Sequence, residues 1–251
     1  MANGKPVLCE KPLAANADEA MQCVADARAL GVSLVEANHW RHHPIATRLQ
    51  RLRDTEELGR IEQIEVQFHY SVPPEQAHNI RLHYDLGGGA LLDAGSYGVN
   101  LLRMMLGEPV AIGSAKAVTS KPQVDVAMDA TLEFPSGALG RLIVTNASDV
   151  GLNVFAKIKG EKGSAMIRNP FLPHRGCTIT FDRLNDHWIE EIDPTPSYIF
   201  QAGIFVDIVR SGVTRLESAE DAVGNLHVID TIYRAANLQP RGLAVSEQDF
   251  G

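Results

Sequence analysis

The chain has 251 residues, of which 45% are hydrophobic and 22% are charged, a composition typical of a globular protein with one large domain or two smaller ones. Its formal net charge of −8 and the scatter of its basic residues argue against nucleic acid as a partner. No apolar run approaches the roughly 18 residues of a membrane helix, and the three cysteines lack metal-ligand spacing, so we expect a soluble, cytoplasmic protein without a membrane partner.

The first predicted strand covers residues 5–11 and ends in the sequence Glu10-Lys11-Pro12. Pro12 disfavours a helical conformation of Lys11, so we expect the lysine at a stiff corner, and its bond to Pro12 is a candidate for the cis form. Open α/β sheets bind ligands at the carboxyl ends of their strands. Lys11 is therefore a candidate ligand contact, although a Lys-Pro pair at a strand end is more often only a turn.

A helix and a second strand follow at once. We predict the helix over residues 16–30, with Asn16 as its N-cap and Gly31 just past its end, and the strand over residues 32–37. Strand, helix and strand with a short return loop are typical of a βαβ unit in a parallel sheet. A lone βαβ unit cannot cover both faces of its sheet, so we expect the chain to open in the middle of an α/β domain.

From residue 43 onward the pattern changes. Residues 43–58 predict a helix closed by Gly59, and residues 61–70 alternate between apolar and polar side chains, with a slip near Gln63. Such alternation is typical of a half-solvated strand in an antiparallel sheet. Residues 71–86 form a loop long enough to suggest a functional role.

The rest of the chain predicts one helix, a sheet and two more helices. The predicted fold class is therefore an α/β segment followed by an α+β part. The triple glycine 87–89 leads into the helix, which covers residues 90–106. Short spacing between turn residues predicts a mostly antiparallel sheet. Its strands are predicted near residues 110–118, 124–134, 138–147, 152–159, 164–168, 177–182 and 187–192. The last two helices are predicted at 198–211 and 218–237, the second capped by Ser218.

Asp93 and Tyr97 lie one turn apart on a polar face of the helix at 90–106. A carboxylate and a phenol in an otherwise apolar helix are candidates for ligand binding. Two bland interpretations are equally open: Asp93 as a first-turn acid favoured by the helix dipole, and Tyr97 as a residue at the edge of the core. Gly95 and Gly98 flank the phenol and would allow a backbone or a flat ligand to approach.

His39, His42, His43 and Glu36 are of metal-ligating types and lie close together in the sequence. Neighbouring histidines point apart on a helix or a strand, however, so they do not form a convergent ligand set. We therefore predict no metal site.

Four segments together resemble the Gfo/Idh/MocA family, which includes the glucose-fructose oxidoreductase and inositol dehydrogenase relatives. They are residues 8–14, 40–44, 87–97 and 229–235, and they occur in the family's order over essentially the whole chain. The resemblance implies an oxidoreductase that uses NAD or NADP, with a Rossmann domain followed by an α/β domain. The large, mostly antiparallel open sheet of that second domain often forms the interface of a homo-oligomer in the family.

The resemblance also implies roles for individual residues. The family's E-K-P lysine corresponds to Lys11, beside the nicotinamide and the reacting hydroxyl, and its Asp and His pair corresponds to Asp93 and Tyr97. Tyrosine at this position resembles the glucose-fructose oxidoreductase and dihydrodiol dehydrogenase branches rather than the inositol branch. The implied cofactor contacts are Glu10, Lys11, Pro12, Trp40 and Arg41, and the implied substrate contacts are Asp93, Tyr97 and Arg81.

These positions suggest a mechanism. Removing hydride from a carbinol carbon requires loss of the hydroxyl proton to a base within reach. Free tyrosine titrates near 10, and a neighbouring ammonium would favour the phenolate. We therefore predict that Tyr97 exchanges the proton, that Lys11 lowers its pKa and orients the substrate, and that Asp93 binds a second hydroxyl. The expected substrate is a sugar or another polyhydroxylated secondary alcohol.

The sequence departs from the family at its start. No G-x-G-x-x-G occurs anywhere, and about two βαβ units of the family's first domain have no counterpart. We expect residues 1–42 to be the remnant of a Rossmann domain and residues 43–251 to be the substrate and oligomerisation domain, in an incomplete copy of a dehydrogenase. Two alternatives remain open: a non-catalytic oligomerising or sugar-binding module, and a domain completed by another chain.

Overall fold

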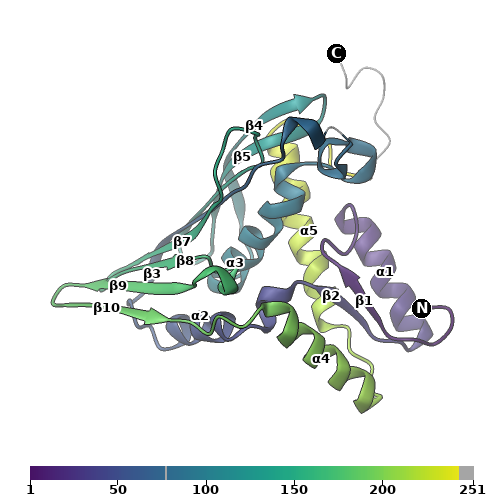
Figure 1. The fold of residues 1–251 in the computed structure, drawn as a ribbon, viewed down its shortest axis with the longest axis horizontal. Helices are drawn as coiled ribbons and strands as arrows, with labels where there is room; N and C mark the ends of the chain where they lie inside the picture. Colours follow the sequence, from purple (N-terminus) through teal and green to yellow (C-terminus); the bar gives the residue numbers. More distant parts are fainter. Residues whose placement is uncertain (77, 243–251) are drawn as a thin grey trace.

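The computed structural model describes residues 1–76 and 78–242. Residues 77 and 243–251, which the predicted second domain includes, lie outside this description. Figure 1 shows a small α/β unit, a long helix α5 (Glu217–Ala235) beside it, and a large sheet on the other side of that helix. No helix among the described residues is long and apolar enough to cross a membrane.

The small unit consists of β1 (Val7–Glu10), α1 (Ala17–Leu30) and β2 (Leu34–Ala37), with β1 and β2 paired in parallel. The predicted signals act as expected at both ends of α1. Asn16 accepts a hydrogen bond from the backbone N–H of Glu19. Gly31 adopts a left-handed conformation with a φ of 65°, which is unfavourable for residues other than glycine. The predicted βαβ unit is confirmed.

The large sheet has eight strands in the order β10-β9-β8-β7-β3-β6-β5-β4. The strands are β3 (Ile61–His69), β4 (Ala111–Lys121), β5 (Val124–Glu133), β6 (Leu139–Thr145), β7 (Asn153–Gly160), β8 (Gly163–Arg168), β9 (Thr178–Arg183) and β10 (Asp186–Glu191). Its pairings are antiparallel except that β3 runs parallel to β6, a pairing that the alternation of β3 did not indicate. The slip near Gln63 is confirmed as a register shift against β7. The fold class, a small parallel sheet followed by a large and mostly antiparallel one, is confirmed.

Three helix predictions need correction. The helix α2 (Pro44–Asp54) ends at Thr55, before Gly59. The predicted helix over 90–106 divides into a π-helical turn η5 (Leu91–Gly95) and α3 (Ser96–Leu106). Ser218 does not cap α5, because its hydroxyl accepts a hydrogen bond from the backbone N–H of Glu36 in β2. The remaining helix, α4 (Ser197–Ser211), matches its prediction within one residue.

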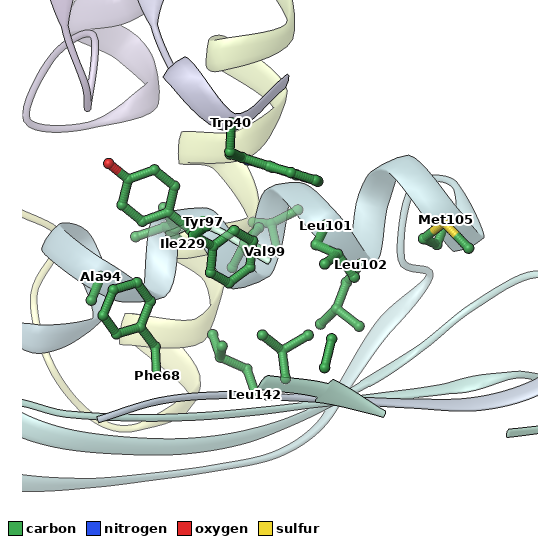
Figure 2. Packing of buried hydrophobic residues seen from close by; sticks show 14 of the residues in the cluster. Trp40, Phe68, Ala94, Tyr97, Val99, Leu101, Leu102, Met105, Leu142 and Ile229 are labelled. Carbon is green, nitrogen blue, oxygen red and sulfur yellow. The ribbon is translucent and has the colours of Figure 1, made fainter. Parts of the chain in front are cut away.

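Helix α3 packs directly on the large sheet, and the core lies between them. Figure 2 shows Leu101 and Leu102 of α3 above Leu142 of β6, with Ile229 of α5 behind the helix. The approach is close because Gly98 has no side chain: a Cβ there would collide with Cδ1 of Leu142. The glycines beside Tyr97 therefore admit side chains of the sheet, so of the two partners that the sequence left open a flat ligand is not the one that approaches them.

We expect Gly98→Ala to lower the free energy of unfolding by about 1–3 kcal/mol, because the added methyl overpacks the contact with Leu142. Gly203→Ala in α4 is the matched control, since a Cβ there meets no atom within 4 Å. Alanine should stabilise this second helix position by about 0.5–1 kcal/mol. Urea unfolding measures both changes, and a loss of stability in both variants would contradict the packing argument.

Candidate active site

A cavity of about 780 Å³ opens where the end of β1 faces the π-helical turn η5. Its walls come from distant parts of the sequence that the fold brings together. Polar and aromatic side chains on its walls are Glu10, Lys11, His39, Phe68, Tyr70, Arg81, Asp85, Asp93, Tyr97, Phe171, His174, Arg175 and Tyr198. The cavity thus combines charged groups with a flat apolar surface, as sites for small polar molecules do.

Lys11 follows β1 and is joined to Pro12 by a cis peptide bond, as the sequence suggested. Its side chain is 9% exposed. The ammonium donates to both the backbone carbonyl of Asp93, at 2.7 Å, and the carboxylate Oδ1, at 2.9 Å. The nitrogen also lies 4.7 Å from the centroid of the Tyr97 ring. Lys11 and Asp93 are 82 positions apart, so the fold alone creates this pair.

Asp93 binds three side chains at once. Besides Lys11, Oδ2 accepts from the Tyr70 hydroxyl at 2.6 Å and from Nε of Arg81 at 2.5 Å. Burial alone would raise the pKa of this carboxyl, but the positive charges of Lys11 and Arg81 outweigh burial and hold it at about 2. Asp93 is therefore ionised and held by other elements, which goes beyond its interpretation as a first-turn acid.

We expect the ionised Asp93 to contribute a pH-dependent part of the stability. Because its folded pKa is depressed to about 2, the contribution is complete above the unfolded pKa of about 3.9 and disappears as the pH falls through about 2. The difference in unfolding free energy between the chain and Asp93→Asn should shrink by about 2 kcal/mol over this window. Urea unfolding at several pH values measures it, and a constant difference would contradict the assigned charge network.

Tyr97 lies at the floor of the cavity and packs against the stacked rings of Phe68 and Phe171. Its hydroxyl lies 3.0 Å from Nε2 of His39. Burial, together with the nearby Tyr198 and Glu10, raises the pKa of Tyr97 well above its usual value. The expected lowering by Lys11 is absent from this arrangement, because that ammonium is bound to Asp93 instead.

Not all residues implied by the resemblance reach the cavity. Glu10, Lys11, Pro12 and Arg81 line it, together with the catalytic candidates. Trp40 does not line it: this residue is fully buried and packs edge-on against Phe171 in the core, because its large apolar ring gains most there. Its implied contact with the cofactor stays a prediction.

Arg41 is also absent from the cavity wall. Its guanidinium forms an ion pair with Asp221 of α5. The position next to Trp40 therefore ties the short helix η1 (His39–His42) to α5, and the implied contact of Arg41 with the cofactor stays a prediction.

Among the cavity residues that were not predicted, Tyr70 and His39 form hydrogen bonds with predicted ones, Asp93 and Tyr97. Tyr70 follows β3 two positions after Phe68, and this spacing places both on the same face. The two-residue period of a β-strand could therefore have identified Tyr70 as a neighbour of Phe68 from the sequence. His39 was considered only as a metal-ligating type, and its partner Ser197 is 158 positions away, so no local pattern could have linked them.

Comparisons with known proteins identify relatives of this chain. A sequence model of the GFO/IDH/MocA C-terminal domain matches residues 46–166. D-xylose 1-dehydrogenase (NADP(+)) 2 of Haloferax volcanii is 32% identical over 235 residues, which is 93% of this chain and 71% of that protein. A trans-1,2-dihydrobenzene-1,2-diol dehydrogenase of Sus scrofa is 33% identical over 174 residues, or 68% of this chain and 50% of that protein.

Solved structures show the same fold. A 3-ketoreductase from Actinomadura kijaniata, in complex with NADP and TDP-benzene, superimposes with a TM-score of 0.83 at 23% identity, over 93% of this chain and 72% of that one. The aldose-aldose oxidoreductase from Caulobacter crescentus, complexed with glycerol, gives a TM-score of 0.83 at 25% identity, over 94% of this chain and 71% of that one.

Proposed function

This chain belongs to the Gfo/Idh/MocA family of oxidoreductases, and we propose that it transfers hydride between NADP or NAD and a hydroxyl-bearing carbon of a sugar or another polyhydroxylated alcohol. One observation carries the proposal. Lys11, Asp93 and Tyr97, which come from two separate segments of the resemblance, converge on one cavity with an ammonium, a carboxylate and a phenol. The relative that acts on D-xylose and the structures with NADP or glycerol support it.

The residues at the end of β1 fit the nicotinamide end of a cofactor. Glu10, Lys11 and Pro12 form one wall of the cavity opposite Asp93, and they are the residues that would hold this end. The sequence contains no G-x-G-x-x-G, so this chain offers the pyrophosphate no glycine-rich turn. When bound, the nicotinamide supplies the group that takes up or delivers hydride. We assign residues 1–42 to the cofactor side of the cavity and the rest of the chain to the substrate side.

The chain's own residues bind the substrate and move its proton. An ammonium has three N–H donors, and the two bonds to Asp93 leave Lys11 one for a substrate oxygen. Asp93, which stays ionised, accepts from a second hydroxyl group. Tyr97 exchanges the proton of the reacting hydroxyl, since its phenol lies at the cavity floor. The aromatic wall of Phe68 and Phe171 gives the apolar face of a sugar ring a surface to pack on.

We also propose that the uncovered face of the large sheet mediates a homo-oligomer. Figure 1 shows the helices on one side of this sheet. The other side carries half-buried apolar residues such as Ile143 and Phe155 between charged ones. Light scattering of the purified chain measures the mass, and a monomer at all concentrations would contradict this assignment.

The activity is tested by mixing the purified chain with NADP⁺ or NAD⁺ and a panel of aldoses, polyols and a trans-dihydrodiol. We expect reduced nicotinamide to accumulate with at least one substrate class, measured by its absorbance, and D-xylose is the first probe because of the relative that oxidises it. A folded, monodisperse protein that reduces neither cofactor with any member of the panel would contradict the proposal and favour a non-catalytic role.

A further inference from the structure

Two polar side chains lie behind the phenol of Tyr97, and neither has a role in the proposed function. His39, in η1, places Nε2 3.0 Å from the phenol oxygen, and its Nδ1 lies 2.7 Å from Oγ of Ser197 at the start of α4. His39 is 2% exposed and Ser197 is fully buried. Figure 2 shows the phenol oxygen pointing away from the large sheet. The three side chains form a hydrogen-bonded row that runs from the cavity floor into the interior.

His39 is held as a neutral imidazole. Its ring lies 4.3 Å from the ring of Tyr198, tilted by 35°, which fixes its orientation. Burial, and then the positive charge of Lys11, lowers the pKa of His39 to about 4. With its proton on Nδ1, the imidazole donates to Ser197 and leaves the lone pair of Nε2 to accept the O–H of Tyr97.

We propose that His39 is the proton partner of Tyr97, a positioning residue that acts through the phenol; this inference rests on the proposed function. During oxidation the substrate's hydroxyl proton passes to the phenol oxygen while the phenol's own proton passes to Nε2 of His39. The carbon–hydrogen bond breaks, hydride leaves for the nicotinamide, and the C=O bond forms. The imidazolium keeps its Nδ1–H on Ser197, and after turnover its Nε2 proton returns to the Tyr97 oxygen while the phenol releases a proton into the cavity. Reduction runs the same transfers in reverse.

This route avoids an isolated buried phenolate. The pKa of Tyr97 lies above its usual value of about 10, whereas that of His39 is about 4. At neutral pH, protonating His39 means working about three pH units above its pKa, whereas deprotonating Tyr97 means working more than three units below its pKa. Protonating His39 is therefore the less costly of the two changes. The row therefore gives the proton a closer destination than bulk water.

Other titratable or charged groups face the same row and contribute to any pH profile. They are Glu10 and Lys11 at the end of β1, Glu36 on β2, His42 and His43 beside His39, Asp93 in η5, His174 in η6 (Pro173–Arg175) and Tyr198 on α4. A profile of the native chain alone would mix their contributions. The test therefore compares variants.

His39→Gln is the main variant, because glutamine keeps polar atoms at this position but cannot take up a proton. We expect kcat to fall about tenfold or more with KM unchanged. In the native chain kcat should also fall as the pH drops through the pKa of His39, since the imidazolium cannot accept a proton, and this limb should disappear in the variant. His42→Gln, a half-buried neighbour that does not touch the phenol, should keep the native kcat. A native kcat and an unchanged profile in His39→Gln would overturn the proposal.

A second readout does not depend on turnover. In NMR spectra of histidine-labelled protein, the imidazole resonance missing from His39→Gln should belong to a neutral ring at neutral pH, and it should shift in Tyr97→Phe. A His39 resonance that titrates near its ordinary value of about 6.5 and ignores Tyr97→Phe would overturn the proposal. If no substrate is turned over, the proposed function fails, and these spectra still decide whether His39 and Tyr97 are coupled.

Discussion

Tyr97→Phe is expected to lower kcat for sugar oxidation by about 10²–10⁴-fold, the usual contribution of a positioned proton-transfer group. The change removes the phenol oxygen, which is the atom that faces both the cavity and His39. The ring contacts with Phe68 and Phe171 remain, so the fold and the shape of the cavity should persist. Steady-state kinetics with saturating cofactor measure the loss, with KM values reported beside kcat.

Tyr198→Phe is the matched control for this experiment. Tyr198 also lines the cavity and packs its ring against His39, but it is 52% exposed, and phenylalanine keeps the ring that makes this contact. We expect its kcat to stay close to that of the native chain. Near-normal turnover by Tyr97→Phe, or equal losses in both variants, would remove Tyr97 from the proton-transfer role.

Arg241→Met is expected to lower the free energy of unfolding by about 3–5 kcal/mol, because it leaves a buried carboxylate without its counter-charge. Arg241 and Asp125 are both fully buried, and Nη2 lies 2.7 Å from Oδ1. The guanidinium also donates to the carbonyl of Gly88 and lies 4.0 Å from the ring of Tyr233. These contacts hold the triple glycine, where a Cβ at Gly89 would collide with Asp125.

Arg60→Met provides the comparison, since Arg60 pairs with Glu161 while their side chains are 61% and 46% exposed. This surface pair should contribute less than about 1 kcal/mol. The double variant Arg241→Met, Asp125→Asn should recover part of the loss, because asparagine removes the unpaired charge and keeps an oxygen that can accept from the backbone N–H of Leu91. Urea unfolding measures all three. Equal losses for the buried and the exposed arginine would contradict the assigned role of the buried pair.

Local signals predicted most of the elements. Asn16 and Gly31 mark the ends of α1 through hydrogen bonds and a φ that depend on nearby residues alone. The alternation around Gln63 revealed both a strand and its irregularity. It could not reveal the parallel pairing of β3 with β6, because alternation shows which face is buried and not the direction of the neighbouring strand.

The residues of the site likewise fall into those that the sequence indicated and those that depend on long-range contacts. The resemblance brought Lys11, Asp93 and Tyr97 together, and the fold confirms that they share a cavity. It did not indicate that Trp40 is buried, because that burial depends on packing against Phe171, which is distant in the sequence. Ser218 does not cap α5 for a similar reason: its hydroxyl accepts a hydrogen bond from the backbone N–H of Glu36 in β2. Contacts between residues far apart in the chain decide these cases, and no local pattern encodes them.

The most direct test of the account is a calorimetric titration of NADPH, and separately NADH, into the folded and monodisperse 251-residue chain. We predict saturable binding at one site per chain for at least one of the two cofactors. Binding should be strongly weakened in Lys11→Glu, which reverses the charge in the cavity wall. No detectable binding of either cofactor, or the same affinity in Lys11→Glu, would contradict the assignment of this cavity to nicotinamide-dependent hydride transfer.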